Sequence, residues 1–227
     1  MSYNVILFDA DHTLFDFDAS EKQAFLNMLK DIQRENDFAH LLPIYITYNQ
    51  KTWEDLEKGY ITQSQLKIER FKRFIEASQI QEDPKFLAQQ FTHHLANASI
   101  LFDHAFKIVK QLSKTYRLAI VTNGLKEVQS KRIRQSVLSP YIETTIISED
   151  IGIVKPDPRI IDYTLKQLHH PSKDDVIIIG DRLSSDIQCG FNAGIDTIWY
   201  NPSLKPNTLD QNPTYTIHHL LELLTIL

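Results

Sequence analysis

The most informative segment of the sequence is Ile6-Leu7-Phe8-Asp9-Ala10-Asp11-His12-Thr13-Leu14, an apolar run that ends in two carboxylates and a hydroxyl. The run is typical of a strand, and ligands of open α/β sheets bind at the carboxyl ends of strands. Asp9 and Asp11 are two residues apart and can face one pocket if the chain stays extended, so that one attacks while the other moves a proton. Alternatively, Asp11 and Thr13 only cap the turn and the helix that follows.

A second apolar run ends in the same way. Val176-Ile177-Ile178-Ile179 leads into Gly180 and Asp181, and another acid, Asp186, follows five residues later. Two buried strands that both deliver carboxylates at their carboxyl ends are much rarer than a single acidic turn. The pair therefore favours a functional site over a simple turn.

Composition narrows the class of protein. The 227 residues are 42% hydrophobic and 23% charged, as in an ordinary globular protein, and the formal net charge of -5 argues against binding to a nucleic acid polymer. The one cysteine, Cys189, excludes an internal disulfide and is interpreted as a small core residue. No apolar run is long enough to span a bilayer, and the N-terminus shows no signal-peptide pattern. We expect a cytoplasmic protein with no membrane association and leave its oligomeric state open.

The chain falls into three stretches. Residues 4–15 hold the first strand and its acidic turn, residues 17–97 show helical periodicity, and strands alternate with helices from about residue 103 onward. The predicted strands are 118–122, 145–148, 176–179 and 195–199, with a helix over 160–168. This alternation predicts an α/β fold with a doubly wound, Rossmann-like parallel sheet. We expect residues 1–16 and 98–227 to form the core and residues 17–97 a helical insert, with the tail 217–227 a short helix on the sheet.

The insert supplies a helix start and candidate binding groups. Thr62 follows a break at Gly59-Tyr60-Ile61 and is predicted to cap the next helix. Several aromatic side chains could form a wall for a flat ligand, although core packing explains them equally well. These are Phe17, Tyr45, Tyr48, Trp53 and Tyr60.

Two further motifs complete the candidate site. Thr122-Asn123-Gly124 stands where a strand ends and a helix begins, and helix N-termini bind phosphate, although the same residues also suit a plain turn. Lys155-Pro156 places a lone cation on a stiff backbone, which is a surface lysine or the cation that an acidic site requires.

The predicted acidic cluster requires positive charge. Neighbouring carboxylates about 4 Å apart repel by roughly 4 kcal/mol per pair at an effective dielectric constant near 20. If Asp9, Asp11, Asp181 and Asp186 converge, a hard divalent cation such as Mg²⁺ would relieve this repulsion. A shared environment would also raise one carboxyl pKa, and that group is the candidate general acid.

Taken together, the four motifs resemble those of the haloacid dehalogenase (HAD) superfamily of phosphatases. The likeness covers nearly the whole chain: Asp-x-Asp-x-Thr, a strand-final Thr122, Lys155-Pro156, and Gly-Asp followed by Asp186 occur in the family's order. The helical insert resembles the cap that one subfamily carries between its first and second motifs. More narrowly, four segments resemble the YjjG-type nucleoside 5′-monophosphatases: Phe8 to Phe15, Gly59-Tyr60-Ile61-Thr62, Thr122-Asn123-Gly124 and Ile147-Ser148-Glu149.

The resemblance implies a division of labour. Asp9 would be the nucleophile that forms an aspartyl-phosphate, and Asp11 would be the general acid and base. Lys155 and Thr122 would hold the phosphoryl oxygens, with a further hydrogen bond from Asn123. Mg²⁺ would be held by Asp9, the backbone carbonyl of Asp11, Asp181 and Asp186, the last directly or through water.

The resemblance also separates candidate reactions. Dehalogenases of this group carry no acid at the position of Asp11, because halide leaves without a proton, so Asp11 favours phosphate chemistry. The substrate implied is a small phosphomonoester, a nucleoside 5′-monophosphate and in particular a pyrimidine one. The alternatives are a phosphatase for a sugar phosphate or phosphoglycolate, a phosphomutase, and a catalytically silent binding protein. The role of His12, where many relatives carry glycine, stays open.

Overall fold

The computed structural model describes residues 3–227, except the side chains of Glu57 and Gln63. The chain divides into two compact units: an α/β unit made of residues up to 17 and from 99 onward, and a helical unit over residues 18–98. The predicted insert, residues 17–97, differs from the helical unit by one residue at each end. The two segments that join the units pair in antiparallel fashion through Phe15 and Leu101.

The α/β unit is built on a six-stranded parallel sheet with the strand order β3-β2-β1-β4-β5-β6. Its strands are β1 (Val5–Phe8), β2 (Arg117–Thr122), β3 (Thr144–Ile147), β4 (Val176–Gly180), β5 (Asp196–Tyr200) and β6 (Tyr215–Ile217). The chain runs outward from β1 in both directions, which is the doubly wound arrangement predicted from the sequence. The predicted fold class is thus confirmed.

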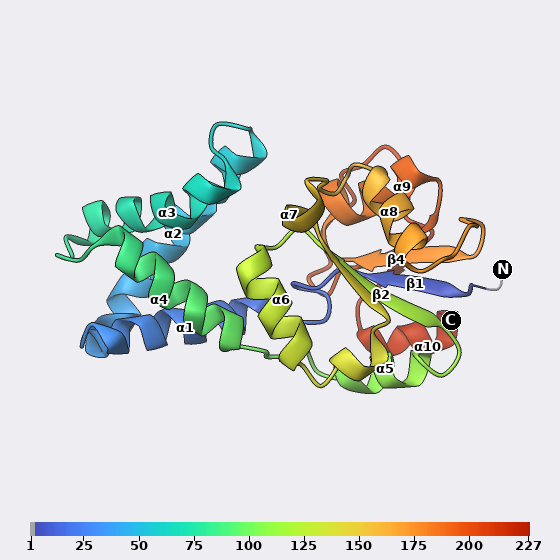
Figure 1. Ribbon diagram of the computed structural model, residues 1–227, viewed down its shortest axis with the longest axis horizontal. Helices are drawn as coiled ribbons and strands as arrows, with labels where there is room; N and C mark the ends of the chain where they lie inside the picture. Colours follow the sequence, from blue (N-terminus) through green and yellow to red (C-terminus); the bar gives the residue numbers. More distant parts are fainter. Residues whose placement is uncertain (1–2) are drawn as a thin grey trace. The chain divides into compact units, whose positions relative to one another are not determined.

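Helices cover both faces of the sheet because alternate strand residues point to opposite sides (Figure 1). Ile6 and Phe8 face the side covered by α5 (Ala105–Leu112) and α10 (Leu223–Ile226). Val5 and Leu7 face the side covered by α8 (Arg159–Gln167) and α9 (Gln188–Ala193). Every residue of β1 is fully buried, so this strand forms the centre of both hydrophobic cores.

Further helices and helical turns follow or precede the strands of the α/β unit. They are α6 (Lys126–Gln135), α7 (Ser148–Ile151), the 3-10 helices Ser139–Tyr141 and Leu220–Glu222, and a π-helical turn over Leu183–Ile187. The tail 217–227 was predicted as a short helix; its first residue ends β6, and Leu220–Glu222 and α10 (Leu223–Ile226) are helical.

The helical unit contains one 3-10 turn (Glu35–Asp37) and four α-helices among the described residues. The α-helices are α1 (Phe17–Asp31), α2 (Phe38–Glu57), α3 (Gln63–Ser78) and α4 (Pro84–Asn97). Thr62 caps α3 with its side chain in a capping box with Gln65, as predicted.

An aromatic cluster fills the interior of the helical unit. Tyr45 stacks on Phe25 with ring centroids 4.6 Å apart and on Phe71 at 5.6 Å, and it is fully buried. Tyr45 is therefore a core residue, as the alternative of core packing predicted. Tyr60, in contrast, is 74% exposed. The Tyr45 hydroxyl donates to the buried Glu21 carboxylate, which also accepts a hydrogen bond from Asn49.

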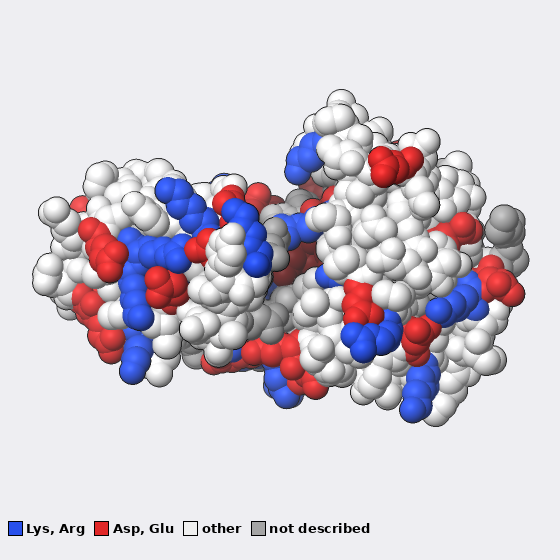
Figure 2. Space-filling view, turned by 90° about the horizontal axis from the view of Figure 1, so that it is seen from above, with Lys and Arg blue, Asp and Glu red and all other residues white. Residues whose placement is uncertain are grey.

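Charges of both signs are mixed on the surface. On the face shown in Figure 2, Lys and Arg side chains lie beside Asp and Glu side chains rather than in a continuous basic area. In the helical unit, for example, Arg73 pairs with Asp55 at 2.8 Å and with Glu69 at 3.3 Å. Among the described residues, no helix combines the length and hydropathy needed to cross a membrane.

Candidate active site

The predicted site residues lie at the carboxyl ends of three neighbouring strands. Phe8, at the end of β1, is in register with Ile120 of β2 and Ile179 of β4. Asp9, Thr122 and Asp181 therefore follow the same edge of the sheet. The backbone N–H of Asp9 continues the ladder by donating to the carbonyl of Ile179 at 2.8 Å.

Three of the four predicted carboxylates converge at this edge. Asp9, Asp181 and Asp186 each offer a side-chain oxygen, and these oxygens lie within 4.8 Å of one another. Lys155 lies among them, with its Nζ 2.6 Å from Asp9 Oδ1 and 2.7 Å from Asp186 Oδ1. Lys155 is only 3% exposed, so the alternative of a surface lysine is wrong.

Asp186 reaches this centre by folding back over Gly180. A Cβ atom at Gly180 would lie 2.4 Å from the Asp186 side chain, so only glycine leaves room for it there. The Asp186 carboxylate accepts hydrogen bonds from the backbone N–H of Arg182 at 3.0 Å and from the Ser185 hydroxyl at 3.2 Å. These contacts and the Lys155 ion pair engage both oxygens of Asp186.

Burial and mutual repulsion disfavour full ionisation of the carboxylates. Burial raises the pKa of Asp9 well above its usual range, and the charges of Asp186 and Asp181 add to this while Lys155 opposes it. Burial, together with Asp186, raises the pKa of Asp181 to about 6. Burial lowers the pKa of Lys155, but Asp186 and Asp9 outweigh this effect, so the net pKa is raised. The raised carboxyl pKa values belong to Asp9 and Asp181, two of the expected metal ligands, which are buried and crowded together.

The candidate phosphate-binding residues lie beside Lys155. Thr122 is 1% exposed, and its hydroxyl oxygen accepts the backbone N–H of Gly124 at 3.1 Å. The Asn123 side chain donates to the carbonyl of Lys155 and accepts the backbone N–H of the same residue, both at 2.9 Å. Asn123 therefore ties the loop after β2 to the backbone of Lys155, a contact that the sequence did not indicate.

Asp11 lies apart from the three converging carboxylates. Its Oδ2 accepts a hydrogen bond from Gln129 Nε2 at 2.6 Å, and its Oδ1 pairs with the guanidinium of Arg132. Sequence reasoning missed both of these α6 residues. The available signal was their spacing of three, which places two polar side chains on one face of a helix.

The donor set suits a divalent cation. Three carboxylates with oxygens this close form a hard, negatively charged site of the kind that Mg²⁺ prefers. Burial and the neighbouring carboxylates raise the pKa values of Asp9 and Asp181, so a further positive charge would favour their ionised forms. Asp9, Asp181 and Asp186 each offer an oxygen to such an ion, Asp186 directly or through water.

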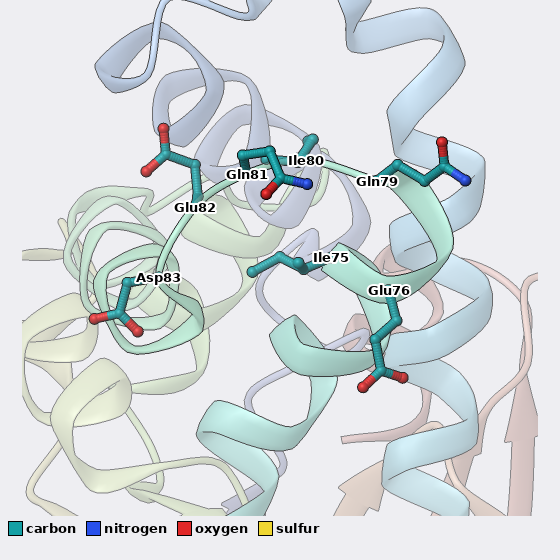
Figure 3. Close-up of a pocket in the computed structure, with 7 residues that line it drawn as sticks. All are labelled: Ile75, Glu76, Gln79, Ile80, Gln81, Glu82 and Asp83. Atoms are coloured by element: carbon teal, nitrogen blue, oxygen red, sulfur yellow. The ribbon is translucent and has the colours of Figure 1, made fainter.

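A cavity of about 670 Å³ in the helical unit lies away from the predicted residues along the chain (Figure 3). It is lined by the end of α3 and the segment before α4, including Glu76, Glu82 and Asp83. Figure 3 shows these three carboxylates pointing in different directions. They do not form a convergent site like the one at the edge of the sheet.

The α/β unit is thus a doubly wound sheet with an acidic centre at the carboxyl ends of its strands. A family model described as haloacid dehalogenase-like hydrolase matches residues 6–200. The chain belongs to this family, as its four motifs predicted.

Full-length relatives support this assignment. The pyrimidine 5′-nucleotidase PynA of Streptococcus pneumoniae is 38% identical, with 100% of this chain and 96% of that protein covered. The pyrimidine 5′-nucleotidase YjjG of Escherichia coli is 32% identical over 98% of this chain and 97% of its own. The crystal structure of the HAD-hydrolase YfnB from Bacillus subtilis, bound to magnesium, has a TM-score of 0.90 and 35% identity, with 100% and 99% of the two chains covered.

Proposed function

We propose that this protein hydrolyses nucleoside 5′-monophosphates, in particular pyrimidine ones, to the nucleoside and inorganic phosphate. The observation that carries the proposal is the buried centre in which Lys155 joins Asp9 to Asp186 beside Asp181. The substrate class is supported by the full-length likeness to PynA and YjjG. We infer a small-molecule substrate and a cytoplasmic location.

In this proposal, Asp9 is the nucleophile. Its carboxylate stands at the end of the buried strand β1, where the backbone is held on both sides by neighbouring strands. Attack of Asp9 on phosphorus would form an aspartyl-phosphate and divide the hydrolysis into two easier steps. Lys155 orients this carboxylate, and Lys155, Thr122 and Asn123 are the proposed partners of the phosphoryl oxygens.

Asp11 is the proposed general acid and base. It would give a proton to the leaving nucleoside oxygen in the first step and take one from the attacking water in the second. The presence of an acid here supports phosphate transfer over dehalogenation, because halide needs no proton to leave. The carboxyl group stands within the segment that continues β1, two residues from the nucleophile.

The proposed cofactor is Mg²⁺, with Asp9, the Asp11 backbone carbonyl, Asp181 and Asp186 as its protein ligands. When bound, the ion would neutralise the negative charge that Asp9 and the phosphoryl group bring together. The chain's own residues account for the remaining work: Lys155 holds Asp9 and Asp186 in place, and the Trp199 indole fixes the backbone carbonyl of Asp181 at 2.9 Å.

We further propose residues 17–97 as a cap that selects the substrate, with residues 1–16 and 98–227 as the catalytic core. The core motifs contact only the phosphate, so discrimination between nucleotides and other phosphomonoesters needs residues from elsewhere. Among the aromatic candidates, Tyr48 and Trp53 are partly exposed and Tyr60 is largely exposed, whereas Tyr45 is buried in the helical core.

The test is phosphate release from a panel of substrates with Mg²⁺ or with a chelator. The panel holds the pyrimidine and purine nucleoside 5′-monophosphates, sugar phosphates and phosphoglycolate, and Asp9→Asn is the inactive control. We expect Mg²⁺-dependent release that is fastest with pyrimidine nucleotides and absent in the variant. Release only from the other phosphates would refute the nucleotidase assignment, while isomerised substrate without free phosphate would indicate a phosphomutase. Binding with no turnover at all would leave a binding protein.

A further inference from the structure

Two side chains of α6 engage both carboxylate oxygens of Asp11. Gln129 donates to one oxygen and Arg132 pairs with the other, although Asp11 lies more than a hundred residues away in the sequence. Gln129 is 1% exposed and the Arg132 side chain is fully buried. Two buried polar residues on one helix face that meet the same carboxylate form a built arrangement rather than an incidental surface contact.

Gln129 and Arg132 also fix each other. Arg132 Nη2 donates to Gln129 Oε1 at 2.9 Å, which leaves the Gln129 amide nitrogen directed at Asp11. The guanidinium carbon of Arg132 lies 4.8 Å from the centre of the Phe15 ring and 5.8 Å from that of Phe17. Phe15 belongs to the same segment as Asp11, and its ring helps to hold the Arg132 guanidinium in place.

The remaining guanidinium nitrogens of Arg132 add a second observation. Among the described residues, Nε and Nη1 are buried and have no hydrogen-bond partner. The hydrogen bonds of the guanidinium are made by Nη2, to Asp11 and to Gln129.

Gly124 makes room for this arrangement. A Cβ atom at Gly124 would lie 2.2 Å from Gln129 Nε2 and 2.7 Å from its Cγ, closer than any real contact. The glycine of the Thr122-Asn123-Gly124 motif therefore lets Gln129 pass close to the backbone on its way to Asp11.

We propose that Gln129 and Arg132 are positioning residues that hold the Asp11 carboxyl group in the orientation needed for proton transfer. The inference rests on the proposed function. In the first step the bond from Asp9 to phosphorus forms, the bond to the leaving oxygen breaks, and Asp11 gives its proton to that oxygen. In the second step water attacks phosphorus, its proton goes to Asp11, and Asp9 is released. Both α6 partners donate hydrogen bonds, so they suit the carboxylate that exists between the two steps.

The test compares leaving groups. Hydrolysis of a nucleoside 5′-monophosphate releases an alkoxide, a poor leaving group that needs a proton. Hydrolysis of p-nitrophenyl phosphate releases p-nitrophenolate, a good leaving group that needs none. We expect Arg132→Met and Gln129→Met to lower kcat/KM about 100-fold for the nucleotide, the lower range for loss of general acid–base catalysis, and only several-fold for the aryl phosphate. Arg132→Lys, which keeps one cationic donor, should recover part of the loss. Arg134→Met, an exposed arginine on the same helix, is the matched control.

A purely structural role would give a different result. Equal losses on both substrates would overturn the proposal, and so would a further loss from Arg132→Met in an Asp11→Ala background, where no positioned acid remains. If the wild-type protein hydrolyses aryl phosphate but no nucleotide, the substrate assignment fails. The comparison is then made with the hydrolysed phosphomonoester of the panel that has the poorest alkyl leaving group. If no substrate is hydrolysed, the proposed function fails. A crystal structure of Arg132→Met with an unchanged Asp11 orientation would refute the positioning role whatever the activity.

Discussion

Lys155 connects the charges of the candidate site. Its ammonium group donates to Asp9, to Asp186 and to the backbone carbonyl of Val121 at 2.7 Å, so all three of its protons have acceptors within the protein. These contacts hold the carboxylate of Asp9, the proposed nucleophile, in one position. The centre has three carboxyl groups and one lysine, so the protonation of the carboxyl groups depends on pH. This dependence is most directly measurable at Asp181.

Stabilisation by Mg²⁺ is expected to grow as the pH rises through about 6, the pKa to which burial and Asp186 raise Asp181 from 3.8. The folded protein without metal binds this proton more tightly than the unfolded chain does. Asp181 therefore contributes stability at low pH that is lost between 3.8 and about 6, where the carboxylate becomes available to a cation.

The measurement is the melting temperature with and without Mg²⁺ at about pH 5 and about pH 7.5, on either side of this transition. We expect a clearly larger Mg²⁺-induced rise at the higher pH. In Asp181→Asn, which cannot ionise, the rise should be small and change little between the two pH values. An equal rise at both pH values in the wild-type protein would contradict the assignment of Asp181.

Among individual residues, those at the strand ends could be predicted from the sequence, whereas the role of Arg132 could not. Asp9 and Asp181 each follow an unbroken apolar run, which gives a local signal for the edge of the sheet. Arg132 lies on a helix rich in charge, where a buried arginine and an exposed one such as Arg134 look alike in the sequence. Only the packing of α6 against the segment of Phe15 distinguishes them.

Among the secondary-structure elements, β4 and the π-helical turn Leu183–Ile187 work as one unit. The wide turn returns the chain so that Asp186 lies over Gly180, the last residue of β4. Such π-helical turns are frequent at functional sites. The spacing of Asp181 and Asp186 thus depends on the strand, the glycine and the turn together.

Gly180→Ala is expected to disrupt this unit. The added Cβ would overlap the Asp186 side chain at 2.4 Å, so Asp186 must move away from Lys155. We expect the free energy of unfolding to fall by about 1–3 kcal/mol, typical of overpacking, and kcat/KM to fall at least about tenfold. Urea unfolding and Mg²⁺-dependent phosphate release measure the two effects.

Gly194→Ala is the matched control for this prediction. Gly194 ends α9 with a φ of 71°, and a Cβ there would meet nothing within 4 Å. The substitution should cost stability through backbone strain and leave kcat/KM unchanged. If Gly180→Ala loses no more activity than Gly194→Ala does, the placement of Asp186 by Gly180 is refuted.

The sequence predicted the central strands but not the edge strand β6, for a physical reason. Strands β1, β2 and β4 are buried on both faces and appear in the sequence as apolar runs. β6 spans only Tyr215–Ile217, pairs with β5 alone and exposes its first two residues, so it leaves no such run. An edge strand of this kind is specified by its neighbour more than by its own sequence.

At the scale of the whole molecule, each of the two units has hydrophobic packing of its own. The sheet of the α/β unit is packed mainly with aliphatic residues, whereas the helical unit is filled by the cluster that includes Phe71, Phe74 and Phe91. Since each unit buries its own core, each is expected to open as its own cooperative region.

Phe71→Ala is expected to destabilise the helical unit by about 3–5 kcal/mol, the usual cost of removing a buried phenylalanine ring. Amide hydrogen exchange should accelerate within residues 18–98 and stay close to wild type in β1, β2 and β4. The matched control is Phe86→Ala, because the Phe86 side chain is 37% exposed and should change little. Equal acceleration throughout the sheet would mean that the protein unfolds as one region.

The contact of Lys155 with two carboxylates has a consequence for charge balance. The ionised centre holds three negative charges on Asp9, Asp181 and Asp186 and one positive charge on Lys155, a formal surplus of two negative charges. One divalent cation cancels this surplus, whereas a monovalent ion would leave the centre negative and a trivalent one would reverse it. A phosphate dianion would then approach a centre with no formal net charge. In the proposed reaction, the charge of Lys155 would thereby determine which valence of metal ion lets the centre accept a phosphomonoester.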